Sequence, residues 1–391
     1  MINYKSKTII IICMPILLFL VLISSDPFSF FHPFGFKMYG MNMRMHAASA
    51  IKSGNYDSYI LGTSMLENTS ARNLEKVFPG SHFANISISG GNYFERAIIL
   101  NFLLKNPGTK RVFFSLDGVY LTQPTERSDY PSKNFTFLYN TNPVDDIAVY
   151  FNLTNLKQIA RYLLKEHGKK ETSDKYFGFN RPNAWMYVEE HMCRFGGLNR
   201  WLAAKNNNQI ISAFAQITST ASKIASGDVK KLPPDEEEQA IRDAIAYCEK
   251  YVINHVRENP SVMFYLVFPP YSRIQYATWH QYAVSNAHTH EAAVRYFAKM
   301  AGELDNLFVY GFEDQDFLDQ IELYKDTSHY HPDINQRINM CIKNGECMLT
   351  PENIEQYLDK ARKAALSFDL VGLGGKIQKY LDERSSSDSQ K

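Results

Sequence analysis

Short apolar runs alternate with stretches of helical periodicity over the first third of the chain. Residues 59–61, 82–86 and 111–116 are apolar runs that predict buried β-strands. Residues 71–77 and 94–104, which lie between them, carry apolar side chains at the spacing of a helix that buries one face. Strands that alternate with helices in this way predict a parallel sheet with helices on both faces.

The same pattern returns towards the C-terminus. Residues 262–268 are a strongly apolar strand candidate, residues 307–310 are another, and residues 351–366 have the periodicity of a helix. We therefore expect one α/β domain over residues 50–375, whose parallel sheet takes strands from both ends of the chain.

The middle of the chain has a different character. Residues 121–234 are rich in Asn, Tyr, Lys and Ser, and their strand signals are weak. Helical periodicity is clear at 155–165 and 209–225, and proline followed by acidic residues at 233–238 indicates a helix start. We expect a mostly helical insertion that acts as a lid or a partner surface. The serine-rich tail, residues 384–391, is predicted to be disordered.

The N-terminus predicts a membrane anchor. Residues 8–23 are almost entirely apolar, follow Lys5 and Lys7, and give way to polar residues. This run falls just below the usual transmembrane length of roughly 17–25 residues, so a cleaved signal peptide is the alternative. Because no small-x-small cleavage site follows, we expect a transmembrane signal anchor over residues 1–25. The positive flank would keep the N-terminus in the cytoplasm and place the remaining domain outside it.

Composition narrows the function classes. The chain has 391 residues, enough for one large α/β domain with insertions or for two smaller domains. Its 42 basic and 41 acidic residues give a formal net charge of +1, so there is no electrostatic reason to expect a nucleic-acid partner. The 24 Tyr and 26 Phe suit carbohydrate stacking, although core packing explains them more simply.

Two of the five cysteines lie close together in the sequence. Cys341 and Cys347 flank a polar stretch that contains a glycine, so a local disulfide is plausible in an oxidising compartment. Unpaired thiols are the alternative, and the sequence leaves both open. The cysteine spacings do not match a zinc site.

A serine and a histidine at opposite ends of the chain suit nucleophilic catalysis. Ser64 follows the first predicted strand in the motif Gly62-Thr63-Ser64, and His329 stands three residues after Asp326. A serine hydroxyl attacks only when a base takes its proton, and the base must be oriented by a third group. We therefore predict a Ser64–His329–Asp326 site. Taken alone, the serine motif is more typical of a helix N-cap.

The carboxyl ends of the predicted strands provide candidates for an oxyanion hole and a substrate site. Ligand sites in parallel sheets gather at this edge, and Ser64, Gly90 and Asp117 all follow strands closely. Backbone N–H groups of Ser64 and of Gly90 or Gly91 are candidate oxyanion donors. A plain strand-to-helix turn is the alternative for the two glycines. Asp117 is a candidate substrate-binding residue.

Three further residues are weaker candidates. Tyr271 and Arg273 follow a predicted strand and are expected to line the substrate site, with a rigid loop as the alternative. His331, together with Asp326 and His329, has a spacing that suits a metal. We nevertheless expect no metal and no organic cofactor, because serine ester chemistry needs neither.

These motifs together resemble the SGNH/GDSL hydrolase superfamily. Gly62-Thr63-Ser64 matches its first block, with Thr63 in place of the more usual Asp, and Gly90 or Gly91 matches the glycine of the second block. The Asp-x-x-His pair already described matches the fifth block. The resemblance implies a flavodoxin-like three-layer α/β/α sandwich and ester chemistry through a nucleophilic serine.

The third block departs from the family. The family has Gly-x-Asn-Asp there, and its asparagine side chain donates to the oxyanion, whereas this chain reads Ser115-Leu116-Asp117-Gly118. An ionised Asp117 cannot donate a hydrogen bond. The role is therefore absent, filled by Asn92, or filled by another group.

The layout resembles the membrane-anchored SGNH-like proteins that modify bacterial envelope polymers, such as the D-alanyl lipoteichoic acid transfer protein family and relatives in polysaccharide O-acetylation. The resemblance covers residues 58–117 and 262–335 and leaves out the insertion. It implies an exported, membrane-tethered serine esterase or O-acyltransferase. Its expected partners are an acylated polysaccharide or envelope polymer and a membrane-bound acyltransferase. The alternative is an inactive SGNH-like protein that binds glycan or assembles a complex.

Overall fold

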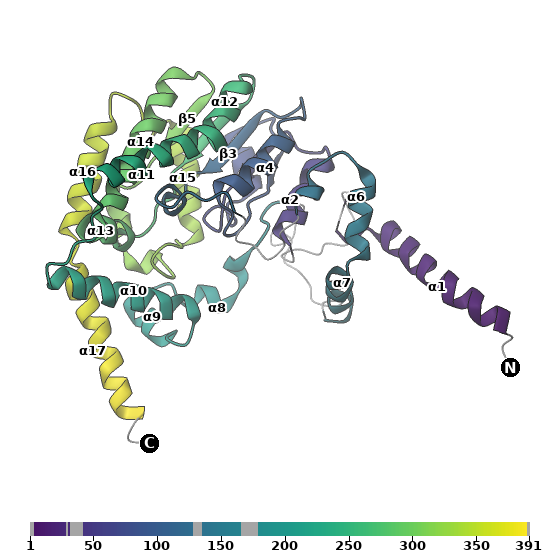
Figure 1. Cartoon of the computed structure of the whole chain (residues 1–391), viewed down its shortest axis with the longest axis horizontal. Coiled ribbons are helices and arrows are strands. Elements are labelled where there is room, and N and C mark those ends of the chain that lie inside the picture. Colours follow the sequence, from purple (N-terminus) through teal and green to yellow (C-terminus); the bar gives the residue numbers. More distant parts are fainter. Residues whose placement is uncertain (1–3, 29, 32–41, 128–134, 166–178, 389–391) are drawn as a thin grey trace.

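The chain forms an α/β fold around a five-stranded parallel sheet (Figure 1). The computed structural model describes residues 4–28, 30–31, 42–127, 135–165 and 179–388. The strand order is β2-β1-β3-β4-β5, and all neighbours are parallel. The strands are β1 (Ser58–Leu61), β2 (Phe83–Asn85), β3 (Arg111–Ser115), β4 (Met263–Val267) and β5 (Leu307–Tyr310). All five predicted strands are confirmed, as is the joining of strands from both ends of the chain.

Hydrophobic cores cover both faces of the sheet. One core joins the sheet to α4 (Tyr93–Leu103), α11 (Pro234–Cys248), α12 (Asn254–Glu258) and α14 (Val284–Glu303). The other joins it to α3 (Ala71–Val77), α13 (Arg273–Gln281) and α15 (Pro332–Asn344). A parallel sheet buried on both faces explains why the strands read as continuous apolar runs without alternation.

A row of aromatic rings runs across the neighbouring strands β3, β4 and β5. Phe113 on β3 is in register with Tyr265 on β4, and Tyr265 is in register with Phe308 on β5. The ring centroids of Phe113 and Tyr265 are 4.8 Å apart, and those of Tyr265 and Phe308 are 5.1 Å apart, both stacked. Aromatic cross-strand pairs of this kind stabilise the sheet and fix its register.

The segment between β3 and α11 contains helices joined by loops, and none of its described residues lies in a strand. Its helices are α5 (Gly118–Leu121), α6 (Pro143–Ala148), α7 (Leu153–Lys165), α8 (Glu189–Met192), α9 (Leu198–Ala203) and α10 (Asn208–Ala225). Short 3₁₀ turns lie at Thr136–Leu138, Val149–Phe151 and Trp185–Tyr187. After the insertion, a π-helical turn at Glu249–Ile253 joins α11 to α12.

The C-terminal part of the chain contains more helix than we predicted. After the 3₁₀ turns Asp316–Asp319 and Ile321–Leu323 come α15, α16 (Ile354–Ser367) and α17 (Leu370–Asp388). α17 packs along α10, where a Cβ atom on Gly374 would lie 2.3 Å from the Cβ of Ala221. α17 continues to Asp388, so residues 384–388 are helical and their predicted disorder is wrong. Residues 389–391 lie outside the described part.

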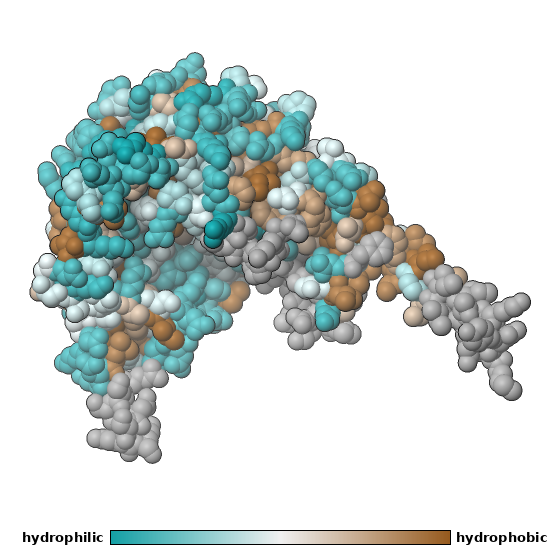
Figure 2. Space-filling model, viewed as in Figure 1, coloured by the Kyte–Doolittle hydropathy of each residue, from teal (hydrophilic) through white to brown (hydrophobic). Residues whose placement is uncertain are grey.

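The apolar N-terminal segment forms α1 (Tyr4–Ser25), and α2 (Met43–Lys52) follows it. The structure does not bear out the predicted transmembrane helix: none of the helices in the described residues is both long and apolar enough to span a bilayer. α1 and α17 leave the body at opposite ends of the molecule (Figure 1). The surface of the α/β body is largely hydrophilic in Figure 2, with hydrophobic residues gathered near the base of α1.

The structure brings together the two cysteines that the sequence singled out. The Sγ atoms of Cys341 and Cys347 lie 2.9 Å apart, and both residues are free thiols. α15 ends at Gly345 in the left-handed conformation (φ 69°), and Cys347 also has a positive φ of 58°. The turn between helix end and sheet edge thus places the two side chains face to face.

Candidate active site

Ser64 lies in a tight turn directly after β1. The backbone N–H of Gly62 donates to Ser87 Oγ at 3.0 Å, and a Cβ atom on Gly62 would lie 2.6 Å from the side chain of Leu66. Glycine is therefore needed for the chain to turn this closely. The N-cap of the following helix α3 is Ser70, whose side chain accepts from the Asn73 N–H at 3.3 Å. Ser64 is thus not the cap of that helix, and its half-buried hydroxyl is available for other contacts.

His329 and Asp326 complete the predicted constellation. His329 Nε2 lies 2.9 Å from Ser64 Oγ, and His329 Nδ1 lies 3.0 and 2.9 Å from the two carboxylate oxygens of Asp326. These distances are within hydrogen-bond range, so the hydroxyl, imidazole and carboxylate form a continuous relay. With a proton on Nδ1 held by the carboxylate, Nε2 is left free to accept the serine proton.

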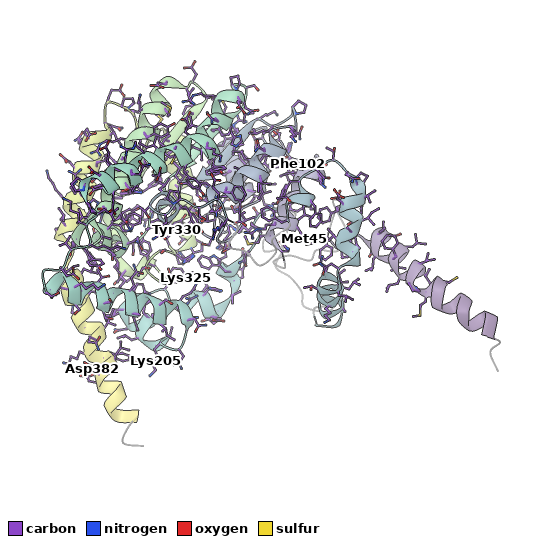
Figure 3. The ribbon with its side chains drawn as sticks, in the orientation of Figure 1. Met45, Phe102, Lys205, Lys325, Tyr330 and Asp382 are labelled. Atoms are coloured by element: carbon purple, nitrogen blue, oxygen red, sulfur yellow. The ribbon has the colours of Figure 1, made fainter. Side chains whose placement is uncertain are left out.

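Backbone contacts fix the turn that carries Asp326 and His329. The N–H groups of Ser328 and His329 donate to Asp326 Oδ1 at 2.9 and 2.8 Å. Burial alone would raise the pKa of Asp326, but attraction to His329 and its hydrogen bonds holds this pKa below its ordinary value. Tyr330 OH donates to Met65 O at 2.7 Å and so ties the histidine turn to the serine turn. Lys325 and Tyr330, labelled in Figure 3, directly precede Asp326 and directly follow His329 in the sequence, respectively.

Asp117 supports the serine turn and does not bind substrate. It is buried, and its carboxylate accepts from Thr63 Oγ1 at 2.6 Å and from Ser115 Oγ at 2.5 Å. The guanidinium of buried Arg96 lies 3.3 Å from the same carboxylate and donates to the Ser115 backbone oxygen at 2.6 Å. With its oxygens committed to these donors, Asp117 cannot serve the predicted substrate-binding role.

The predicted oxyanion donors differ in whether their backbone N–H groups already have an acceptor. Among the described residues, no acceptor lies within hydrogen-bond range of the backbone N–H of Ser64 or of Gly90. Gly90 is exposed with a φ of +68°, a conformation that glycine adopts without strain. The N–H of Gly91 donates to Ile88 O at 3.0 Å, so this glycine belongs to the turn.

Asn92 does not replace the missing family asparagine. Its Oδ1 accepts from the Glu95 N–H at 2.9 Å as the N-cap of α4, and its Nδ2 donates to Arg127 O at 2.7 Å. The side chain is fully buried, and both ends of the amide are occupied. The prediction that Asn92 contributes to the oxyanion hole is therefore wrong.

Arg273 and Tyr271 are buried as well. Arg273 is buried, and its guanidinium pairs with Asp319 at 2.9 Å and donates to the backbone oxygens of Glu313 and Gln315 at 2.6 and 2.8 Å. Tyr271 is buried against neighbouring aromatic rings, and burial raises its pKa well above the ordinary value. Burial and its three contacts turn the Arg273 guanidinium away from the role that we predicted, and the role of Tyr271 stays a prediction.

His331 has a local role. Its Nδ1 accepts from the Asp333 N–H at 3.3 Å and caps α15. Within the part of the chain that the structure describes, no three His, Cys, Asp or Glu side chains gather in a way that would hold a metal ion.

A narrow crevice beside the relay brings in four residues that the sequence analysis did not assign to the site. It leaves about 160 Å³ of empty space, part of it open to solvent, and is lined by Ser64, Met65, Trp185, His329, Tyr330 and Asn335. Asn335 follows the histidine motif by a few residues on α15, so its position could have been suspected. Trp185 comes from the insertion, where no sequence pattern connects it with the site.

A cluster of cations borders Trp185. Lys325 Nζ lies 4.0 Å from the centroid of the Trp185 indole and 3.0 Å from His191 Nδ1, and Arg194 Nη2 lies 2.7 Å from the same nitrogen. Burial and these two positive charges lower the pKa of His191 to about 4, so its ring is neutral and accepts from both. Burial lowers the pKa of Lys325 to about 8, while Asp326 opposes the change.

A buried carboxylate lies near the same cluster. Glu67 is almost fully buried, and burial raises its pKa to about 8 from an ordinary value of 4.5, although Lys325 opposes the increase. Its Oε2 atom has no hydrogen-bond partner in the described residues. Glu67 is therefore a polar group that the fold buries at a cost.

The geometry thus places a hydroxyl, an imidazole and a carboxylate in hydrogen-bonding order at the carboxyl ends of the strands, beside a small crevice to which the insertion contributes Trp185. No protein-family model matches the chain, and no curated protein matches it in sequence.

Proposed function

We propose that this protein is a serine esterase or O-acyltransferase. The observation that carries the proposal is the continuous relay from Ser64 Oγ through His329 to Asp326, with 2.9 Å between Ser64 Oγ and His329 Nε2. Such a contact is the arrangement in which imidazole can take the serine proton. It favours a catalytic site over the alternative of an inactive binding module, for which no such contact is needed.

The mechanism follows from the positions of the three groups. Ser64 Oγ attacks the acyl carbonyl as His329 Nε2 takes its proton, and Asp326 stabilises the imidazolium that forms. The unpartnered backbone N–H groups of Ser64 and Gly90 are the donors available for the oxyanion. The imidazolium then protonates the leaving alcohol. Water or a sugar hydroxyl, deprotonated in turn by His329, releases the acyl group from Ser64.

The fold supports membership of the SGNH/GDSL hydrolase superfamily as part of the proposal. The strand order β2-β1-β3-β4-β5 is the order of flavodoxin-like sheets, whose ligand sites lie at the switch point between β1 and β3. Ser64 follows β1 at this point. The departure at Asp117 becomes intelligible in this setting, because the carboxylate holds the serine turn through Thr63.

The substrate class and location follow from the family resemblance. We infer an exported enzyme that acts on acyl esters of an envelope glycan or similar polymer, with α1 directing export or attachment at the membrane. A membrane-bound acyltransferase is the proposed partner for a transfer reaction. Neither a metal nor an organic cofactor enters the proposed mechanism.

The experiment is covalent labelling of the full chain with a fluorophosphonate, which reacts with activated serines. We expect stoichiometric labelling at Ser64, together with hydrolysis of p-nitrophenyl acetate. Ser64→Ala should abolish both, and His329→Ala should slow labelling by at least ~10²-fold because the base is lost. Ser226→Ala, which removes an exposed hydroxyl at the end of α10, is the matched control and should retain both activities. Labelling that persists in Ser64→Ala, or is absent from the wild type, would refute the proposal.

A further inference from the structure

The crevice beside the nucleophile is too small for an ordinary ligand. Its lining residues leave no space inside it that a water molecule could enter, whereas pockets for small molecules usually measure ~300–1,000 Å³. Ser64 and His329 both line it, so an acyl carbon bonded to Ser64 Oγ stands at its mouth. The first carbons of the acyl chain therefore meet the walls of the crevice as soon as the acyl-enzyme forms.

Trp185 is the largest of those walls and the only one that the insertion contributes. It is 4% exposed and begins the 3₁₀ turn Trp185–Tyr187. The remaining lining residues come from the serine turn, from the histidine turn and from α15. The size of the crevice is thus set by a segment that supplies no part of the catalytic relay.

Several contacts hold the indole in place. Lys325 Nζ lies over the ring, 4.0 Å from its centroid, in a cation–π contact. The ring of Phe195 stacks on it at 6.0 Å, and that of His191 lies 5.7 Å away. Lys325 directly precedes Asp326 in the chain, so moving the indole would disturb the turn that orients the base.

We propose, as an extension of the proposed function on which it rests, that Trp185 is a specificity-determining residue that limits the acyl group to acetyl size. A methyl group next to the carbonyl stays beside Ser64 at the mouth of the crevice. A chain of four or more carbons needs the volume that the indole occupies. Because Lys325, Phe195 and His191 hold the indole in place, a longer acyl chain cannot displace the Trp185 ring and is excluded.

The test is the acyl-chain-length profile of the full chain with p-nitrophenyl acetate, butyrate and octanoate. We expect kcat/KM for acetate to exceed that for octanoate by ~10²-fold, since hydrophobic pockets discriminate by this order per few methylenes. Trp185→Ala should lower the acetate-to-octanoate ratio at least tenfold, and Trp185→Leu should lower it less. Tyr187→Ala, an exposed neighbour on the same turn, is the control and should leave the ratio unchanged.

The ratio makes the outcome independent of how much of each variant folds, because both esters are measured on one sample. A wild-type ratio near one, or a ratio that Trp185→Ala and Trp185→Leu leave unchanged, overturns the inference. If the fluorophosphonate labels Ser64 in that case, the proposed function survives and only the specificity assignment fails. Absence of both labelling and hydrolysis of every ester overturns the two together.

Discussion

Four buried side chains hold the turn that carries Ser64. The carboxylate of Asp117 joins the hydroxyls of Thr63 and Ser115 to the guanidinium of Arg96, and solvent reaches none of the four to any extent. The Arg96 guanidinium also lies over the Phe114 ring, 4.3 Å from its centroid. The carboxylate accepts from both hydroxyls and offsets the positive charge of Arg96, and such pairing is the condition under which charged groups are tolerated in a core.

Removal of the carboxylate should therefore be costly. We expect Asp117→Ala to lower the free energy of unfolding by ~3–5 kcal/mol, because it leaves the Arg96 guanidinium buried without its counter-charge. Urea unfolding followed by circular dichroism measures the change. Asp305→Ala, which removes an exposed carboxylate before β5, is the control and should change stability by less than ~0.5 kcal/mol. A small loss in Asp117→Ala would contradict the supporting role.

Glu67 gives a prediction about pH. Its pKa is raised by burial to about 8, so the folded protein keeps this proton at pH values where the unfolded chain releases it. The contribution of Glu67 to stability is therefore complete below pH ~4.5 and is lost as the pH rises towards 8. In Glu67→Gln this fall in the free energy of unfolding is absent. As the pH rises from 4.5 to 8, the variant should therefore become more stable relative to the wild type by several kcal/mol, since each pKa unit corresponds to ~1.4 kcal/mol.

The measurement is the free energy of unfolding of both proteins at a series of pH values from 4 to 8. Glu236→Gln, which changes an exposed carboxylate on α11, should give a curve parallel to that of the wild type. If the Glu67→Gln curve also runs parallel to the wild type, Glu67 does not carry a buried proton.

At the scale of elements, the end of α15 meets the edge of the sheet. The N–H of Gly311 donates to Cys347 O at 3.1 Å, and the N–H of Leu349 donates to Val309 O at 2.8 Å. The residues after α15 therefore pair with the end of β5 at the edge of the sheet. Cys341 lies in the last turns of α15 and Cys347 in this edge segment. The contact between their sulfur atoms is thus also the contact between a helix and the sheet.

The two thiols should form a disulfide on exposure to oxidised glutathione. Two thiols then lose two electrons and two protons, and the glutathione disulfide is reduced to two thiols. The Sγ–Sγ separation of 2.9 Å makes closure possible with little backbone movement. Mass spectrometry should show a loss of about 2 Da within the peptide that spans both residues, and unfolding should become harder by ~2 kcal/mol, as for a short loop. Cys341→Ser should show neither change, and a wild type without the mass loss would contradict the prediction.

The elements show which kinds of feature a sequence can predict. The five strands were predictable because a sheet covered on both faces needs uninterrupted apolar runs, and residues 262–268 are such a run. The relay was predictable because Ser64 and His329 each follow a recognisable local pattern. The roles of Asp117 and Arg273 were not predictable. A charged residue after a strand looks the same in the sequence whether its side chain faces solvent or a buried partner. Only the contacts in the fold distinguish the two cases.

At the scale of the whole molecule, the site is assembled from three parts of the chain. The serine turn comes from the N-terminal half of the sheet, the histidine turn from the C-terminal part, and Trp185 from the insertion between them. α10 of the insertion packs along α17, so the insertion is also held by the last helix of the fold. This arrangement was beyond sequence analysis, because helical periodicity shows that α10 buries one face but not which partner covers it.

The place of Trp185 has a consequence for how such a protein diversifies. In the proposed function, the reaction depends on the serine and histidine turns, while the fit of the substrate depends on a separate stretch of chain that contacts them through Lys325. A change of insertion would alter the choice of ester and leave the bond-breaking step as it is. Proteins that share this pair of turns but carry other insertions should therefore perform one reaction on different molecules. The choice of substrate and the bond-breaking step thus belong to two different segments of one chain, and Lys325 is the contact between them.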